Sequence, residues 1–384
     1  MWRAKSFVAE ETRILTRMRF ILRFLGCLVA LPLAAQSSGT VVEYDVKYPS
    51  APSVATGACH PAPGGSTHEI TFNANGGREL WITGQNYDEV VKVGLDGSMT
   101  YHAMPSGSGP HGIEFDAAGR LWVSLELTGQ IVRLDAGGAI QQTIDVGLDC
   151  PTCADGKKLN PHPHGLWIGP DGKTIWFTGK GSGTIGKVTP EGKMTTYALK
   201  TVGSVPIYIR PGNDGAMWAT EMVGNAIARI GTDGSVSEFP IPTYNSRPIA
   251  IVPEPGSNAM WFSEQVGNKV ARITPEGKIT EYALPMTQAN VILASLAFDA
   301  DRNLWVQQYV DQNAPTPANP SPAGSDSIIK IDKSILTAPD LSRVPITYYS
   351  VPSRQTIMHR IVQGPDGNIW FTELGVNKVG KLVR

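Results

Sequence analysis

The sequence predicts an all-β fold, a seven-bladed β-propeller made of four-stranded antiparallel blades. A tryptophan recurs about every 42 residues, and turn motifs such as Pro365-Asp366-Gly367 recur with it. The stretches between the turns are short and apolar, with almost no helical periodicity. A period of about 40–50 residues that holds four strands is typical of a propeller blade.

Seven of the nine tryptophans occupy one repeat position, each after Leu, Ile or Met: Trp81, Trp122, Trp176, Trp218, Trp261, Trp305 and Trp370. In the last copy, Ile369-Trp370-Phe371 is apolar without alternation, as expected for a strand buried on both faces. The preceding Pro-Asp-Gly supplies a preset φ, an Asx side chain and a residue free to take positive φ, so it predicts a tight turn.

We expect a single propeller domain over residues 41–384. Its blades are expected at residues 66–105, 109–147, 161–200, 204–242, 246–285, 291–352 and 356–384. The last repeat stops one strand short, and residues 41–49 resemble the outer strands of other repeats. The N-terminal segment should therefore complete the last blade and close the ring, which removes exposed sheet edges.

The N-terminus predicts export. Residues 18–35 have a basic start, an apolar middle and a small-residue end, as in a secretory signal, with residues 1–17 as an upstream extension. The alternative is a membrane anchor, which the short apolar run, interrupted by Arg23, disfavours. We expect a periplasmic or extracellular monomer with no membrane association after cleavage. The net charge of −1 favours no nucleic-acid partner.

Three cysteines remain after the expected signal. Cys150 and Cys153 lie in an irregular insertion, and Cys59 lies near the expected start of blade 1. No second Cys-x-x-Cys motif accompanies the pair, so a zinc site has little support. In an oxidising compartment a disulfide is expected, either between Cys150 and Cys153 or between Cys59 and one of them.

One mouth of the ring should collect the chemistry. In an antiparallel blade the innermost strand begins beside the end of the tryptophan strand, so both lie on the same face. Five of the seven histidines fall at such starts: His68, His111, His162, His164 and His359. The tryptophan strands end at Gln85, Glu126, Lys180, Glu221, Glu264, Gln308 and Glu373. Long loops at 50–65, 147–160 and 309–327 should rim the same mouth.

Ring closure makes blades 7, 1, 2 and 3 consecutive, so the histidines should form an arc. Imidazoles transfer protons at neutral pH, which makes His164 and His359 catalytic candidates. The candidates for substrate binding are His68, His111 and Lys180, and those for metal binding are His162, Glu126 and Glu373. The strand spacing of His162 and His164 favours a transition metal over magnesium. The alternative for each is structural: a hydrogen-bonded channel lining, or a carboxylate paired within its repeat.

The repeat motifs, Pro-His-Gly, Asp-x-x-Gly-x-Leu-Trp and Thr-Glu-Tyr-x-Leu-Pro, resemble those of the virginiamycin B lyase (streptogramin B lyase) family over residues 41–384. The resemblance implies a seven-bladed propeller that opens a cyclic depsipeptide at its ester bond by elimination, with magnesium at the mouth. It also implies that His359 matches the catalytic histidine and that Glu373 lies near a metal-binding glutamate. Ile357 replaces the other metal-binding glutamate, and Met358 and Arg360 replace the flanking Pro and Gly.

Other blades carry other parts of the motif. Blade 2 has Pro110-His111-Gly112 with Gly109 where Glu is expected, and blade 3 has Pro163-His164-Gly165 with His162 at that position and Lys180 in place of the second Glu. Three hypotheses follow. The chain is an exported lyase-like enzyme that opens an ester or lactone by metal-assisted elimination, a non-catalytic propeller that binds a ligand or protein, or a metal-dependent lactone hydrolase of the gluconolactonase type.

Overall fold

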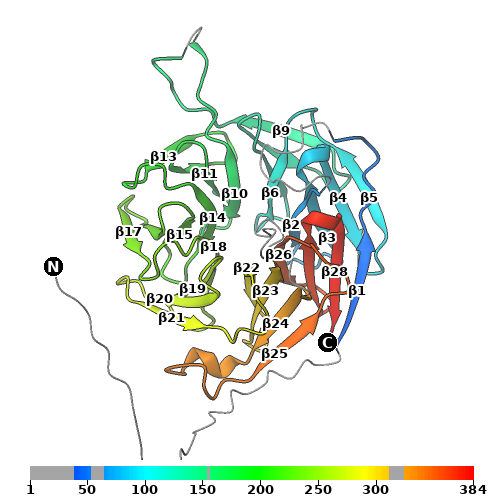
Figure 1. Cartoon of the computed structure of the whole chain (residues 1–384). Coiled ribbons are helices and arrows are strands. Elements are labelled where there is room, and N and C mark those ends of the chain that lie inside the picture. The colour runs from blue at the N-terminus through cyan, green and yellow to red at the C-terminus, as the bar shows by residue number, and fades with distance from the viewer. Residues whose placement is uncertain (1–38, 53–64, 154–155, 311–323) are drawn as a thin grey trace, which may run out of the picture. The chain divides into compact units, whose positions relative to one another are not determined.

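The described residues form a closed ring of seven antiparallel sheets (Figure 1). The structure is a computed structural model that describes residues 39–52, 65–153, 156–310 and 324–384, all within the unit Ala34–Arg384. Inner strands of neighbouring sheets contact one another around the whole ring, including β26 against β2. The expected signal at 1–35, Cys59 and the central parts of two rim loops lie outside the described residues. Among the described residues, no helix is long and apolar enough to span a bilayer.

Every blade has four strands, numbered from the channel outward. Blades 1 to 3 comprise β2 (Thr67–Phe72), β3 (Glu79–Gly84), β4 (Glu89–Gly94) and β5 (Met99–Ala103); β6 (Pro110–Phe115), β7 (Leu121–Leu125), β8 (Gln130–Leu134) and β9 (Ile140–Asp145); β10 (Pro163–Ile168), β11 (Ile175–Gly179), β12 (Thr184–Val188) and β13 (Met194–Ala198). Blades 4 and 5 comprise β14 (Pro206–Pro211), β15 (Met217–Glu221), β16 (Ala226–Ile230) and β17 (Val236–Pro240); β18 (Pro248–Pro253), β19 (Met260–Glu264), β20 (Lys269–Ile273) and β21 (Ile279–Ala283). Blades 6 and 7 comprise β22 (Val291–Phe298), β23 (Leu304–Val310), β24 (Ser327–Ile331) and β25 (Ile346–Ser350); β26 (Met358–Gln363), β27 (Ile369–Glu373), β28 (Lys378–Val383) and β1 (Thr40–Asp45). Short 3-10 turns follow or connect strands at η1 (Gln85–Tyr87), η3 (Lys333–Leu336) and η4 (Leu374–Val376).

The N-terminal strand closes the ring, as predicted. β1 pairs antiparallel with β28, with Thr40 opposite Val383 and Asp45 opposite Lys378. The Lys378 ammonium lies 2.8 Å from Glu43 in the middle of β1. The strand spans residues 40–45, shorter than the expected 41–49, because Val46 leaves the ladder and donates to Asn377 O.

The repeated tryptophan connects the core of a blade to its turn. Trp370 is fully buried, and its indole Nε1 donates to the turn residue Asp366 at 2.9 Å. A buried indole N–H requires such a partner. Trp122 and Asp116 make the same bond in blade 2, at 3.0 Å. The recurrence of Asp before Trp in the sequence therefore has a direct physical cause.

All seven inner strands carry a register irregularity near their start. A β-bulge of this kind inserts an unpaired residue and changes the direction of a side chain. In blades 7, 1, 2 and 3 the first unpaired residue is a histidine: His359, His68, His111 and His164.

Side-chain hydroxyls join each bulge to the neighbouring blade. Thr372 of β27 accepts from the backbone N–H of Arg360 at 3.0 Å and donates to the carbonyl of His68 at 2.6 Å. The equivalent donors in blades 1 and 2 are Thr83, which donates to His111 O at 2.9 Å, and Ser124, which donates to His164 O at 3.3 Å. These bridges fix the backbone of the histidine-bearing strands.

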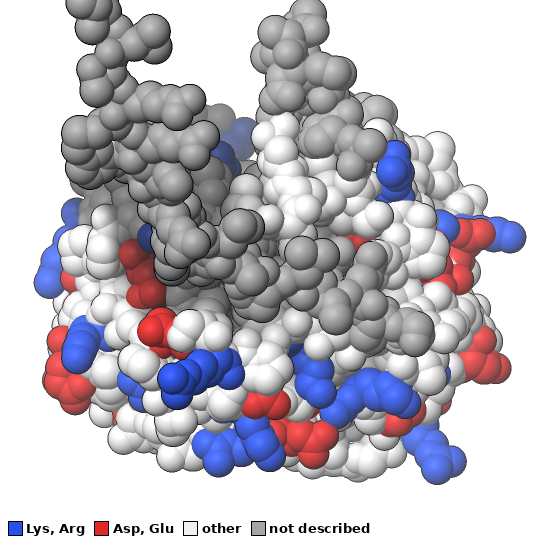
Figure 2. Space-filling view, turned by 60° about the horizontal axis from the view of Figure 1, so that its bottom comes forward, with Lys and Arg blue, Asp and Glu red and all other residues white. Residues whose placement is uncertain are grey.

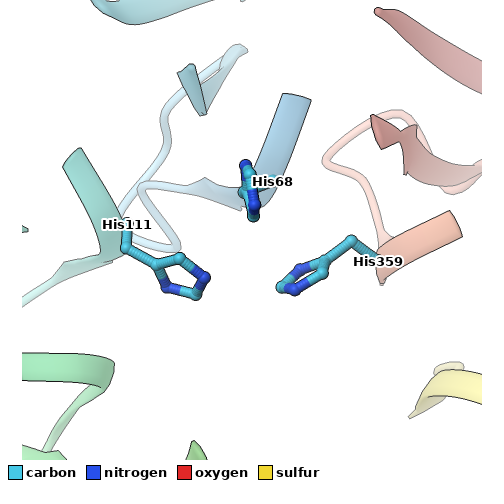
Figure 3. A group of neighbouring side chains, drawn as sticks. All are labelled: His68, His111 and His359. Atoms are coloured by element: carbon cyan, nitrogen blue, oxygen red, sulfur yellow. The ribbon is translucent and has the colours of Figure 1, made fainter. Parts of the chain in front are cut away.

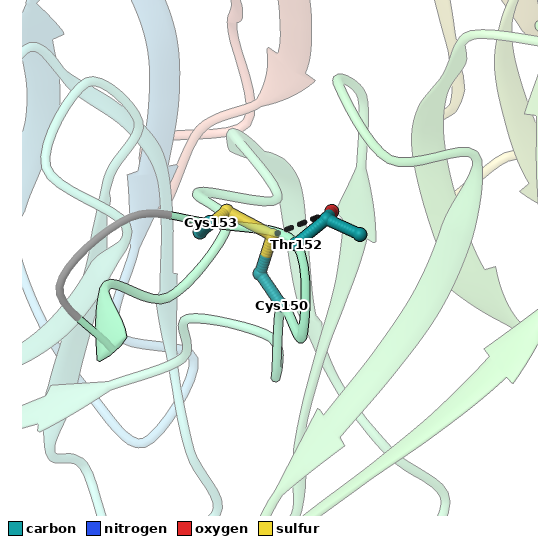
Figure 4. The surroundings of a disulfide bond; sticks show 3 residues. All are labelled: Cys150, Thr152 and Cys153. Atoms are coloured by element: carbon teal, nitrogen blue, oxygen red, sulfur yellow. Dashed lines mark hydrogen bonds between the residues drawn. A yellow bond between two sulfur atoms is a disulfide. The ribbon is translucent and has the colours of Figure 1, made fainter.

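The insertion before blade 3 contains the disulfide that the sequence left between two alternatives. Cys150 pairs with Cys153, and Thr152 lies between them with its Oγ1 3.7 Å from Cys150 Sγ (Figure 4). Leu148 and Leu159 form an isolated antiparallel bridge at the base of this insertion.

Candidate functional site

Four imidazoles come together where the inner strands of blades 7, 1, 2 and 3 begin. The ring of His68 lies 5.1 Å from that of His111 and 5.0 Å from that of His359, centroid to centroid. The rings of His111 and His164 are 3.7 Å apart. In Figure 3, His111 and His359 extend toward each other, with His68 beside the space between them. The structure thus brings four of the five predicted histidines into one group.

Backbone carbonyls orient three of these rings. Nδ1 lies 2.7 Å from Ser66 O in His68, 3.1 Å from His164 O in His111, and 3.0 Å from Ile207 O in His164. Because a carbonyl oxygen can only accept, Nδ1 carries the proton in each ring and Nε2 carries the lone pair.

A carboxylate takes the place of the carbonyl at the fourth ring. His359 Nδ1 lies 3.2 Å from Oε1 of Glu69, and Arg360 Nη1 lies 3.0 Å from the other oxygen of Glu69. Burial alone would raise the pKa of Glu69, but the charge of Arg360 and the neighbouring His359 bring it below its ordinary value. Glu69 is therefore an ionised carboxylate in the channel, with an imidazole on one oxygen and a guanidinium on the other.

His111 and His164 are neutral at neutral pH. Burial lowers the pKa of each well below its ordinary value, assisted at His111 by His164 and at His164 by Lys180. His111 is 1% exposed, and its Nε2 has no hydrogen-bond partner within the described residues.

Glu126 adds a carboxylate beside these two rings. Gln85 Nε2 donates to Oε2 of Glu126 at 2.6 Å, and Lys180 Nζ donates to Oε1 at 3.1 Å. One ligand atom each from His111, Glu126 and His164 lie within 4.8 Å of one another, and the same holds for His68, His111 and His359.

Comparisons with known proteins agree with this architecture. The virginiamycin B lyase family model matches residues 155–314. The virginiamycin B lyase of Nocardia farcinica is 29% identical over 203 residues, which are 53% of this chain and 64% of that protein, so the match spans just under two thirds of the relative's length.

Two solved structures cover nearly the whole ring. A streptogramin B lyase structure superposes with a TM-score of 0.69 at 25% identity, covering 90% of this chain and 97% of that one. A catalytically inactive histidine-to-alanine variant of the Staphylococcus aureus virginiamycin B lyase, solved with quinupristin, gives 0.69 at 27% identity and covers 90% and 99%. The chain is a virginiamycin B lyase-like propeller.

Within this virginiamycin B lyase-like propeller, the predicted ends of the tryptophan strands form two sets. Glu373 is the last residue of its strand and pairs with Met358. In blades 1 to 3 the paired residue is Gly84, Leu125 or Gly179. Gln85, Glu126 and Lys180 follow one residue later, and neighbouring residues of a strand point to opposite sides. This offset explains why Glu126 reaches the histidines whereas Glu373 joins neither histidine group.

The last blade does not fit the magnesium site that the family resemblance implies. Glu373 is fully buried, and burial followed by the nearby charge of Glu43 raises its pKa to about 9, so it is protonated at neutral pH. Ile357 offers no oxygen, whereas magnesium requires oxygen ligands.

His162, the remaining predicted ligand, belongs to neither histidine group of the described residues. Its backbone has a φ of 54°, and its N–H donates to Asn160 Oδ1 at 2.8 Å. The left-handed backbone breaks the strand spacing on which the pairing of His162 with His164 depended.

Proposed function

We propose that the chain opens an ester or lactone by elimination at the mouth formed by blades 7, 1, 2 and 3. The observation that carries this proposal is His359 held by Glu69, which Arg360 holds in turn. An imidazole oriented by a carboxylate is a common arrangement for proton transfer. His359 also occupies the position to which the family resemblance assigns the catalytic histidine, and the S. aureus relative is inactive as a histidine-to-alanine variant.

The reaction needs a base and a means of stabilising negative charge. Nε2 of His359 takes a proton from the carbon next to a carbonyl. The electrons of that C–H bond form a C=C bond, the neighbouring C–O ester bond breaks, and a carboxylate leaves with its electron pair. Glu69 stabilises the imidazolium that results. The Lys180 side chain is 26% exposed, and its ammonium supplies positive charge at the mouth for the departing carboxylate.

The geometry favours His359 over His164 as the base. Burial and the charge of Lys180 lower the pKa of His164 well below its ordinary value, which makes it a weak proton acceptor. The side chain of His359 is 21% exposed, whereas His164 is 8% exposed. We assign substrate contacts to His68, His111 and Lys180.

The proposed substrate class is a cyclic depsipeptide or another small ester or lactone, acted on by an exported monomer. Two features support export: the signal-like segment at 18–35 and the disulfide between Cys150 and Cys153, a bond typical of oxidising compartments. On the face seen in Figure 2, basic and acidic side chains of the described residues are interspersed. A small uncharged ligand suits such a surface better than a polyanion.

The first test follows the fate of a streptogramin B depsipeptide. We expect wild type to give a linear product with the substrate's mass and a new C=C bond, because elimination adds no water. His359→Ala should lower kcat/KM by about a hundredfold or more, the contribution of a proton-transfer group. Glu69→Gln should also lower it, and its pH–rate profile should shift, because the orienting charge is lost.

The matched control is His102→Ala. His102 stacks on Trp81 at 5.4 Å and belongs to neither histidine group, so its removal should leave turnover unchanged. A product heavier by one water would indicate a lactone or ester hydrolase instead, and equal rates for wild type and His359→Ala would remove His359 from the mechanism.

A second candidate function is binding without catalysis. The observation in its favour is the last blade, where Ile357 and the protonated Glu373 replace a pair of metal-binding carboxylates. Saturable binding of the depsipeptide by wild type, without any turnover, would support this candidate.

A further inference from the structure

We propose that His111, His164 and Glu126 form a site for a borderline transition metal ion such as zinc, with two imidazole Nε2 atoms and one carboxylate oxygen as ligands. The site lies between blades 2 and 3, away from the last blade, where the family resemblance implies magnesium. It shares the mouth with the proposed function, but its occupancy can be measured without any substrate.

The donor set and its spacing fit such an ion. The three ligand atoms lie within 4.8 Å of one another, and all three residues are buried. Two histidines and one glutamate are a known zinc set that leaves a fourth position open for water or substrate. Zinc bonds to nitrogen and oxygen are about 2 Å long, so side-chain shifts on the ångström scale complete the coordination.

The surroundings of the two imidazoles match those of metal ligands. A ligating histidine usually donates its other N–H to a carbonyl or carboxylate. Here the Nδ1 of His111 is held by His164 O at 3.1 Å, and that of His164 by Ile207 O at 3.0 Å. Nε2 of His111 is buried and has no hydrogen-bond partner within the described residues, and a metal ion would satisfy it. Both rings are neutral at neutral pH, so no proton has to be displaced.

The neighbours of Glu126 orient it and tune the site. Gln85 and Lys180 hold the two carboxylate oxygens, at 2.6 Å and 3.1 Å. The Lys180 ammonium opposes a second cation, so it should weaken metal binding without preventing it. Magnesium is disfavoured because two of the three ligands are nitrogen, which suits zinc, cobalt, nickel or copper.

The experiment titrates the full chain, stripped with a chelator, with Zn²⁺, Co²⁺ and Mg²⁺. Calorimetry measures affinity, and the visible absorption of Co²⁺ reports nitrogen and oxygen coordination. We expect one equivalent of Zn²⁺ or Co²⁺ and no comparable binding of Mg²⁺. His111→Ala and the near-isosteric Glu126→Gln should each weaken binding by more than about tenfold, the order that losing one ligand or its charge costs. Lys180→Met should tighten it.

Two controls separate a lost ligand from a lost fold. His102→Ala should bind zinc like wild type. Thermal melting should show that zinc raises the Tm of wild type, because it binds only the folded chain, and that this increase is lost in Glu126→Gln. Both variants should melt close to wild type when metal-free.

Several outcomes would overturn the proposal: no zinc binding by wild type, unchanged binding in both His111→Ala and Glu126→Gln, weaker binding in Lys180→Met, or magnesium bound as tightly as zinc. Loss of binding in His68→Ala with unchanged binding in Glu126→Gln would also contradict it, since it would place the ion among His68, His111 and His359. A chain that binds zinc but opens no ester would leave this site intact and overturn only the proposed function.

Discussion

Three glutamates at the ends of tryptophan strands carry protons at neutral pH or close to it. Burial, listed first among the causes for each, raises the pKa of Glu221 to about 7, of Glu264 to about 8 and of Glu373 to about 9. In the unfolded chain such a group titrates near 4.5. The folded state therefore binds more protons across this interval, so stability is fully present below about pH 4.5 and is lost as pH rises through the folded pKa values.

Glu373→Gln tests this at one position. We expect the stability of wild type to fall between about pH 6 and about pH 9, and that of the variant to fall less, by up to about 1.4 kcal/mol per pH unit. Urea unfolding at several pH values measures the difference. The exposed Glu79 provides the control, because Glu79→Gln should follow wild type throughout. Parallel curves for wild type and Glu373→Gln would mean that Glu373 is ionised in the folded state.

The histidine arc could be predicted because each ring lies at the start of an inner strand. Glu69 was missed, because its role depends on Arg360 reaching it from the neighbouring blade. One sequence signal was available: Glu69 and Arg360 both directly follow a channel histidine, at equivalent positions with opposite charge. The distinction between Glu126 and Glu373 depends on a one-residue offset from the strand end, and only the ladder register reveals it.

At the scale of the strands, the residue after each channel histidine controls how closely neighbouring blades approach. A side chain at Gly165 would collide with the backbone oxygen of Ile207, and one at Gly112 would lie 2.7 Å from His164 O. The Pro-His-Gly motif is thus a packing requirement in blades 2 and 3. In blades 7 and 1 this position holds Arg360 and Glu69 instead, and their ion pair fills the channel.

Deleting residues 41–49 tests the contribution of the outermost strand of blade 7. The deletion removes six cross-strand pairs with β28 and the ion pair between Glu43 and Lys378. At about 0.2–1 kcal/mol for each pair, the free energy of unfolding should fall by about 1–6 kcal/mol. Glu43→Gln, which removes only the ion pair, should cost about 1 kcal/mol or less. A truncated chain that melts like the intact one would show that β1 contributes nothing to stability.

At the scale of the whole molecule, the number of blades and the ring closure followed from repeat spacing and from the incomplete last repeat. Periodicity determines these properties because every blade must bury its tryptophan strand against a neighbour. The rim loops follow no repeat, and only the part around Cys150 and Cys153 is described. The sequence therefore predicted the blades better than the surroundings of the mouth.

A circular permutant should fold because the chain ends are neighbours. Thr40 lies opposite Val383, so a short linker can join the end of β28 to the start of β1. Opening the chain at Val202, which is 99% exposed, should leave the Tm within a few degrees of that of residues 39–384 and preserve binding of Co²⁺. Opening it within β11 should abolish folding. Failure of the first permutant to fold would indicate that closure through β1 must occur in the natural order.

The seam between blades 7 and 1 also sets when the protein can become active during its biosynthesis. Glu69 enters the chain early, whereas His359 and Arg360 are among the last residues to leave the ribosome. Thr372, which binds the carbonyl of His68 across the seam, is added later still. A nascent or partly translocated chain therefore lacks the paired imidazole and carboxylate, and any activity at this mouth begins only after the final strands have docked.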